Sequence, residues 1–223
     1  MPKDLAIVFS NGSVNSAVSA ALAAQRYRII LMHAEVLPAP SSRARNAYDQ
    51  QVAHFKPYRE HTLPMPYLAN VQSTGPTSSV DARLPALVAA QLTDLIPLIA
   101  AGARFGAHYN VAAVYLGLRV GPGVDELATA TEFLQIWNEM IQIPCQRPDL
   151  EITAPLLELE PWQVVDLGFN VEAPLEKTWS CVEDSADPCW SCPGCRTREA
   201  AFQQSGKPDP LKGSRQSSVS GRP

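Results

Sequence analysis

Short, continuous apolar runs alternate with segments of helical periodicity along this chain. Leu5–Phe9 (LAIVF) and residues 27–36 (YRIILMHAEV) have the apolar, β-branched composition of strands that are covered on both faces. Between them, Val14–Arg26 carries alanine, leucine and valine at helical spacing. A strand, a polar turn, a helix and a second strand in this order predict a βαβ unit, and therefore a parallel sheet with right-handed crossovers.

The later part of the chain continues this alternation. Residues 111–118 (VAAVYLGL) form the clearest later strand, and we expect them close to the first strand near the centre of the sheet. Residues 80–105 predict a helix with a break or kink at Pro85 and Pro97. The stretch 64–79 is rich in Pro, Ser, Thr, Gly and Asn, which predicts a long loop of the kind that often serves binding. Further helices are predicted at 42–55, at 125–143, from residue 160 and at 196–204. A further strand is predicted at 58–63, and a short strand or extended segment at 152–159.

Length and composition predict one folded domain. The chain has 223 residues and 46% of them are apolar, which is enough for one sizeable core. We expect a three-layer α/β fold, with a Rossmann-like parallel sheet between two layers of helices, over residues 1–204. From residue 205 the composition changes to Gly, Ser, Pro, Lys and Arg, so residues 205–223 are predicted to be a disordered tail.

Charge and hydropathy exclude several classes of function. A net charge of −4 and a pI near 5.6 argue against direct, nonspecific binding to nucleic acid. No run approaches the roughly 18 apolar residues of a membrane helix, so no membrane partner is expected. The N-terminus opens into a strand without an apolar signal segment, and the chain carries a group of thiols near its other end. We therefore expect a reducing, cytoplasmic location.

Four of the five cysteines gather in one short stretch and predict a metal site. Four thiolates satisfy the tetrahedral preference of zinc and leave no open position, which indicates a structural centre. The Pro-Gly pair before the last of these cysteines allows a tight turn. A disulfide pair, a redox-active Cys-x-x-Cys motif and an iron–sulfur cluster are the alternatives. The predicted ligands are Cys181, Cys189, Cys192 and Cys195, in a loop over residues 177–198.

A polar loop follows the first strand and begins the first helix. In an open parallel sheet this is where ligands bind, and the backbone N–H groups of a helix N-terminus favour an anion. Small residues let a phosphate approach the backbone, although the loop matches neither a Walker A nor a dinucleotide-binding pattern. An ordinary capped turn between strand and helix is the alternative. The predicted phosphate-binding residues are Ser10, Asn11, Gly12, Ser13, Val14, Asn15 and Ser16.

These two stretches together resemble the 7-cyano-7-deazaguanine synthases, the QueC family of PP-loop ATP pyrophosphatases. The C-terminal pattern is close: Lys177-Thr-Trp-Ser-Cys181, Cys189-Trp-Ser-Cys192-Pro-Gly-Cys195 and then Arg196-Thr-Arg-Glu-Ala-Ala-Phe202. The middle of the chain agrees in layout more than in residues. The N-terminal loop departs from the family's Ser-Gly-Gly-x-Asp-Ser pattern, because Ser13 replaces its second glycine and Asn15 its aspartate.

The resemblance implies an ATP-dependent ligase with structural Zn²⁺, ATP and Mg²⁺. Such enzymes adenylate a 7-carboxy-7-deazaguanine-type carboxylate, and ammonia or another amine then attacks it. The partners implied are this small deazapurine substrate and ATP, and a homodimer is compatible with the sequence. Lys177, beside the cysteine loop, and Asn15 are the catalytic candidates that the resemblance implies. Because Asn15 carries no negative charge, nucleotide binding is expected to survive while catalysis weakens.

For several other residues, a structural role is the simpler interpretation. Arg83 and Asp125 are candidates for substrate contact, and a surface-charge role is the alternative for each. His33 and His61, near strand ends, are interpreted as structural histidines rather than bases, and the isolated Cys145 as a buried thiol rather than a ligand. The whole chain also fits a diverged ligase with another amine donor, or a catalytically silent nucleotide-binding zinc module that acts through a partner.

Overall fold

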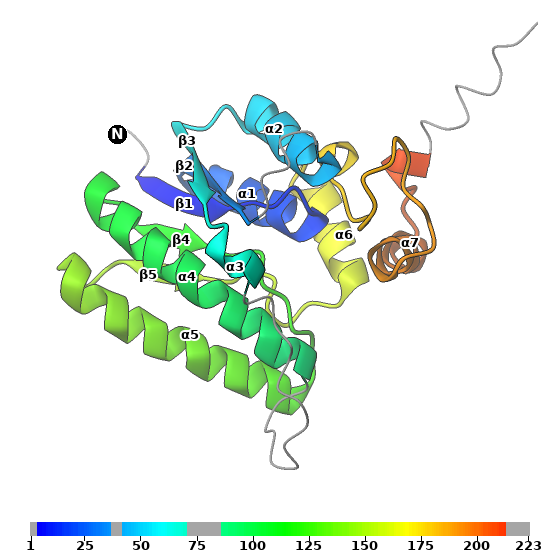
Figure 1. Cartoon of the computed structure of the whole chain (residues 1–223). Helices are drawn as coiled ribbons and strands as arrows, with labels where there is room; N and C mark the ends of the chain where they lie inside the picture. The colour runs from blue at the N-terminus through cyan, green and yellow to red at the C-terminus, as the bar shows by residue number, and fades with distance from the viewer. Residues whose placement is uncertain (1–3, 37–41, 71–85, 213–223) are drawn as a thin grey trace, which may run out of the picture.

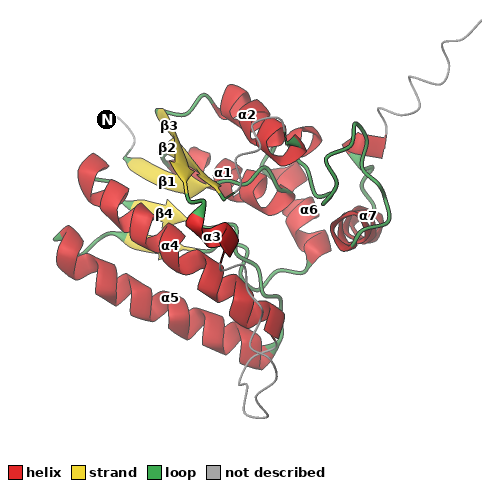
Figure 2. Cartoon of the chain, viewed as in Figure 1, coloured by secondary structure: helices red, strands yellow, loops and turns green. Residues whose placement is uncertain are grey.

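The computed structural model describes residues 4–36, 42–70 and 86–212 of the chain. Strands and helices alternate from the N-terminus to the cysteine loop (Figures 1 and 2). The strands are β1 (Leu5–Phe9), β2 (Arg28–Glu35), β3 (Arg59–Pro64), β4 (Ala113–Tyr115) and β5 (Glu151–Thr153). The helices are α1 (Val14–Arg26), α2 (Arg43–Phe55), α3 (Tyr67–Asn70), α4 (Ala86–Tyr109), α5 (Val124–Cys145), α6 (Pro161–Asn170), the 3₁₀ helix η1 (Leu175–Lys177) and α7 (Pro193–Ser205).

All strand pairs of the sheet are parallel, in the order β3-β2-β1-β4-β5. The prediction that the first strand is central and adjacent to the strand near residue 114 is confirmed, since Ile7 pairs with both Ile30 of β2 and Val114 of β4. The chain adds β2 and β3 on one side of β1 and then crosses to add β4 and β5 on the other. This reversal creates a switch point between the carboxyl ends of β1 and β4, where open α/β sheets bind ligands.

Helices cover both faces of the sheet, which confirms the three-layer α/β fold. Ala6 and Val8 of β1 face α1 and Tyr48 of α2, in a cluster that also takes in buried residues of β2 and β4. Ile7 and Phe9 point to the opposite face and pack in a cluster that includes residues of α4 and α5 (Figure 1). The continuous apolar run of β1 is therefore explained by burial on both sides. Among the described helices, none combines the length and apolarity needed to cross a lipid bilayer.

Three predictions about the middle of the chain differ in part from the structure. Of the predicted break or kink at Pro97, the break is absent. Helix α4 runs through Pro97 as one element, because a proline removes a single helical hydrogen bond while α4 keeps its packing against the sheet and α5. The strand predicted over residues 111–118 is regular only across β4. After β4 the chain leaves the sheet, and the backbone N–H groups of Leu116 and Val120 donate to Thr153 O and Leu157 O. The loop predicted over residues 64–79 contains α3. Residues 71–79 of this loop lie outside the described residues, and so does Pro85.

The C-terminal segment folds back onto the domain beyond the predicted boundary at residue 204. Helix α7 ends at Gly206, which has φ +68°, and the described chain continues to Lys212. Asp209 accepts two hydrogen bonds from Arg198, at 2.8 and 2.9 Å, and both side chains are only 2% exposed. The guanidinium also donates to Thr178 Oγ1 at 2.7 Å, so the pair joins α7, the last segment and the approach to the cysteine loop. The rest of the predicted tail, residues 213–223, lies outside the described residues.

Asp209→Ala should lower the free energy of unfolding by about 3–5 kcal/mol, because it leaves the buried Arg198 guanidinium without its counter-ion. Urea denaturation followed by circular dichroism measures the change. Lys212→Ala is the matched control, since it removes an exposed ion pair with Glu199 and should change stability by less than about 1 kcal/mol. Similar, small effects for the two variants would show that the Arg198–Asp209 pair does not hold the segment in place.

Candidate functional site

The loop after β1 is folded by its own side chains into a compact turn at the start of α1. Ser13 caps the helix and its Oγ accepts from the backbone N–H of Ser16 at 3.4 Å. Asn11 Oδ1 accepts from the N–H of Ser13 at 3.1 Å, in an Asx turn. Gly12 has φ +82°, and a Cβ built there would lie 2.5 Å from Ala44 O, so only glycine fits between this loop and α2. The loop geometry is therefore set by its own capped turn and by the close approach of α2 at Gly12.

The same loop is tied to the segment that leads into the cysteines. Gln51 of α2 is fully buried, and its amide accepts from Ser10 Oγ at 2.8 Å while donating to Lys177 O at 3.1 Å. The backbone N–H of Trp179 donates to Gly12 O at 2.9 Å. Two hydrogen-bonded connections thus join segments that are more than 100 residues apart in the sequence.

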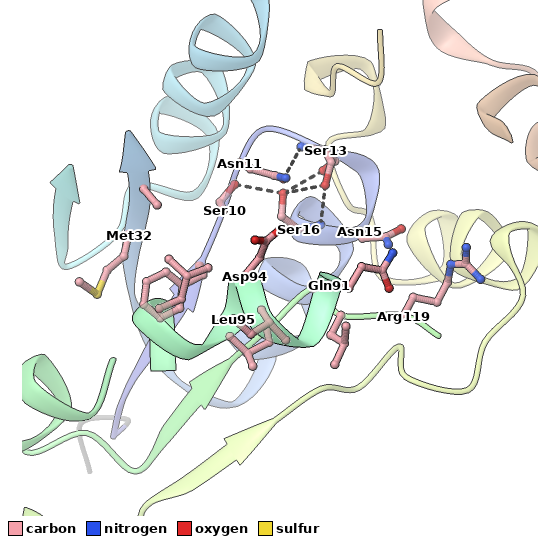
Figure 3. A pocket seen from close by; sticks show the side chains of 16 residues that line it. Ser10, Asn11, Ser13, Asn15, Ser16, Met32, Gln91, Asp94, Leu95 and Arg119 are labelled. Carbon is pink, nitrogen blue, oxygen red and sulfur yellow. Dashed lines mark hydrogen bonds between the residues drawn. The ribbon is translucent and has the colours of Figure 1, made fainter. Parts of the chain in front are cut away.

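A cavity of about 340 Å³, which we call the loop cavity, opens over the carboxyl ends of β1, β2 and β4. Figure 3 shows the loop on one side of it and α4 on the other, with Gln91 and Asp94 projecting from the helix. Asp94 is the one carboxylate among its described lining residues, and Arg119, after β4, is the one cation. The loop hydroxyls, the helix N-terminus and these two charges meet at the switch point of the sheet.

A second cavity of about 410 Å³, the cysteine-side cavity, lies between α1, α6, α7 and the cysteine loop. It shares part of its wall with the loop cavity, and the shared residues are Asn11, Ser13, Asn15 and Arg119. Its lining includes the side chains of Trp179 and Phe202 and part of Cys181. Three of the seven phosphate-binding candidates, Asn11, Ser13 and Asn15, therefore lie between the two cavities.

The four predicted ligand cysteines come together in a way that fits one metal ion. Their Sγ atoms all lie within 4.8 Å of one another, and the pairs Cys189–Cys195 and Cys181–Cys192 are 4.0 Å apart. A tetrahedral ion with metal–sulfur bonds of about 2.3 Å places its sulfur ligands about 3.8 Å apart. A disulfide needs sulfurs about 2.05 Å apart, and all these cysteines are free. The cluster is therefore arranged as a closed set of four metal ligands.

Backbone donors favour the thiolate form in this cluster. The N–H groups of Cys189, Cys192 and Cys195 each donate to the sulfur of another cysteine at 3.4 Å. Hydrogen bonds from Ser191 and from the N–H of Cys192 lower the pKa of the Cys189 thiol to about 6, whereas burial raises the pKa of Cys195 to about 12. A bound cation would supply the charge that deprotonates the buried thiol.

The Pro-Gly pair acts differently from the tight turn predicted for it. Pro193 occupies the first helical position of α7, and Cys192 caps that helix through its sulfur. Gly194 is required because Ser180 O occupies the place where a Cβ would lie. The positive φ falls instead on Trp190, at +56°.

The other candidates lie away from the two cavities or in structural roles. The Lys177 ammonium is 3.3 Å from His54 Nδ1 and lines neither cavity, and Asp125 is exposed in the first turn of α5.

His33 is buried and donates from Nδ1 to Ser10 O at 2.9 Å, and burial lowers its pKa. His61 pairs with Tyr109 OH at 2.8 Å. Cys145 lies against Ala103 O, outside the cluster, as predicted. Arg83 falls outside the described residues.

Sequence reasoning missed Gln51, Asp94 and Arg119. Gln51 is a polar residue on a helix that is otherwise patterned by its apolar side, and nothing local marks it as buried. Asp94 lies inside a long apolar helix, where a single acid usually indicates the solvent-facing side. Arg119 could have been identified from the sequence, because it follows a central strand and lies in a glycine-containing segment at the carboxyl edge of the sheet.

Known proteins show which family this arrangement belongs to. The family model described as "Queuosine biosynthesis protein QueC" matches residues 5–206. The 7-cyano-7-deazaguanine synthase of Chlorobium chlorochromatii is 24% identical over 218 residues, which cover 92% of this chain and 94% of that protein. The synthase of Chloroherpeton thalassium is 26% identical over 93% of this chain and 96% of that protein, and the one of Methanothrix thermoacetophila is 31% identical over 57% of each. Because the family match runs from β1 through the cysteine cluster to the end of α7, the chain belongs to the QueC family of queuosine biosynthesis proteins.

Proposed function

We propose that this protein is an ATP-dependent carbon–nitrogen ligase that activates a 7-carboxy-7-deazaguanine-type carboxylate by adenylation. The observation that carries the proposal is the loop cavity, which is lined by the start of α1 and by Ser10, Ser13 and Ser16 at the switch point of a QueC-family sheet. Backbone N–H groups and the helix dipole favour the phosphates of a nucleotide at this place, and they do not depend on the side chain at position 15.

The reaction needs positioning more than it needs acid–base chemistry. A carboxylate oxygen of the substrate attacks the α-phosphorus of ATP, a phosphorus–oxygen bond forms, and pyrophosphate leaves with the electrons of the broken bond. Ammonia then attacks the carbonyl carbon, loses a proton to solvent, and AMP leaves as the amide forms. A second activation of the amide and elimination would give the nitrile. The protein holds the reacting groups in line and stabilises charge on the phosphate.

The loop cavity offers oxygen ligands of the kind that Mg²⁺ prefers. Asp94 supplies a carboxylate from α4, and the loop opposite supplies hydroxyl and amide oxygens. These residues would hold the ion, which neutralises phosphate charge when it is bound. Asn15 lines the same cavity with an uncharged amide, so Asp94 is the negative charge that the loop itself lacks.

The proposed occupant of the cysteine cluster is a structural zinc ion. Four thiolates leave no open coordination position, and the cluster connects through Trp179 to the loop at Gly12. Lys177 enters this proposal through its backbone carbonyl, which anchors Gln51, rather than through its ammonium.

Elemental analysis should find about one zinc ion per chain. Cys192→Ser should lower both the zinc content and the melting temperature, because metal binding at a site of this kind contributes to folding free energy. Cys145→Ser is the control, since its sulfur lies outside the cluster and the zinc content should not change. Full zinc retention in Cys192→Ser would refute the ligand assignment.

Incubation with ATP, Mg²⁺, 7-carboxy-7-deazaguanine and ammonium should release AMP and convert the acid, with the products identified by mass spectrometry. The expected products are the amide and the nitrile, formed only when both ATP and the acid are present. AMP release without conversion of this acid would point to another carboxylate or amine. The absence of both, together with no ATP binding by calorimetry, would favour a silent module.

Asn15→Asp should increase AMP release while changing the affinity for ATP by less than about threefold. The added carboxylate can assist the metal ion, whereas anion binding rests mainly on backbone N–H groups. Calorimetric titration with Mg²⁺ and ATP beside an AMP-release assay measures both quantities. Rapid release by the parent protein and no gain in the variant would show that Asp94 already supplies the necessary charge.

A further inference from the structure

Arg119 stands in the wall that separates the two cavities. It follows β4 at the carboxyl edge of the sheet and lines both the loop cavity and the cysteine-side cavity, together with three residues of the phosphate loop. Figure 3 shows its guanidinium on the same side of the loop cavity as Asn15. A group held by Arg119 would therefore lie close to anything bound at the loop.

The guanidinium of Arg119 is partly desolvated without a bound counter-ion. Its hydrogen bond goes from Nη1 to the backbone carbonyl of Leu159 at 3.3 Å. Within the described residues, no carboxylate lies within ion-pair distance of it. Burial lowers the pKa of Arg119, and the carboxylate of Glu160 only partly opposes this effect. A partly buried cation that has no ion-pair partner gains free energy when an anion joins it.

The second arginine of the cysteine-side cavity differs in this respect. Arg198 is buried and its guanidinium already has hydrogen-bond acceptors, because Asp209, Thr178 and Leu175 O accept from it. The capacity of this cavity to bind an anion therefore rests on Arg119.

The rest of the cysteine-side cavity suits a flat ring with polar edges. The half-buried Trp179 and Pro161 contribute aromatic and aliphatic surface, Ser180 and Thr197 add polar groups, and the cavity volume of about 410 Å³ is large enough for a bicyclic ring system. Phosphates have a better place in the loop cavity, at the N-terminus of α1. The two cavities thus differ in chemistry, and a planar aromatic acid fits the second.

We propose that the cysteine-side cavity binds the acid substrate and that Arg119 pairs with its carboxylate at the wall shared with the loop cavity. This inference rests on the proposed function and adds the residue that selects the substrate. The paired carboxylate oxygen is held beside the loop, where it forms its bond to the α-phosphorus as the bond from that phosphorus to pyrophosphate breaks. Arg119 moves no proton in this step, and its role is to bind and orient the acid.

The test compares each acid with its uncharged amide. Full-length parent protein and Arg119→Gln are titrated with 7-carboxy-7-deazaguanine and its 7-carboxamide, and with nicotinate and nicotinamide, in the presence of Mg²⁺ and a non-hydrolysable ATP analogue. The parent should bind each acid about 10- to 100-fold more tightly than its amide, and Arg119→Gln should lose this preference. Arg119→Lys should keep part of it, because the charge remains while the paired hydrogen bonds are lost. Arg104→Gln, at an exposed position of α4, is the matched control and should bind like the parent.

The outcomes separate the two proposals. Affinity for the ATP analogue should change less than about threefold in Arg119→Gln, and zinc content and melting temperature should not change. A fall in nucleotide affinity with an intact acid preference would overturn the inference and make Arg119 a phosphate ligand. Parent protein that binds no acid more tightly than its amide would also overturn it. Preference for nicotinate but not for 7-carboxy-7-deazaguanine would support the role of Arg119 and refute the proposed substrate.

Discussion

The buried amide of Gln51 connects the two ends of the site. An amide that is fully buried must have both its donor and its acceptor satisfied, and here the partners are Ser10 Oγ of the phosphate loop and Lys177 O before the cysteines. The N–H of Trp179 reaches the loop at Gly12 O and closes a second connection. The position of the loop is thus set by tertiary contacts as well as by its capped turn. A metal ion held by the cysteine cluster would stabilise the segment that contacts the loop.

The fold was largely predictable because the strongest sequence signals came from burial. A strand covered on both faces has no polar alternation, and β1 and the residues around Val114 showed this pattern, which correctly placed them side by side in the sheet. Predictions from local rules were less accurate where tertiary packing outweighed them. Pro97 is tolerated within α4 because the helix keeps its contacts with the sheet, and the C-terminal segment is ordered to Lys212 because Asp209 neutralises a buried arginine.

The candidate site was predictable only where its residues are neighbours in the sequence. The cysteines and the loop from Ser10 to Ser16 can each be recognised from one short stretch of sequence. Gln51, Asp94 and Arg119 come from three other elements, and their role depends on which strand lies beside β1. Closeness in sequence did not place the Lys177 ammonium in the lining of either cavity, although Lys177 directly precedes the cysteine-bearing segment.

Charge placement around the altered loop distinguishes this chain from the family pattern. In the family pattern the loop carries its own acid, whereas here position 15 is an amide and the acid that lines the loop cavity, Asp94, projects from α4. A carboxylate on a facing helix can serve a metal ion only if helix and loop are held at a fixed separation. Packing of α4 against β1 meets that requirement, because Gly102 lets the helix approach Phe9 and Val114 closely. The loop therefore carries one charge fewer than the family pattern, and the carboxylate that lines the loop cavity comes from the facing helix α4.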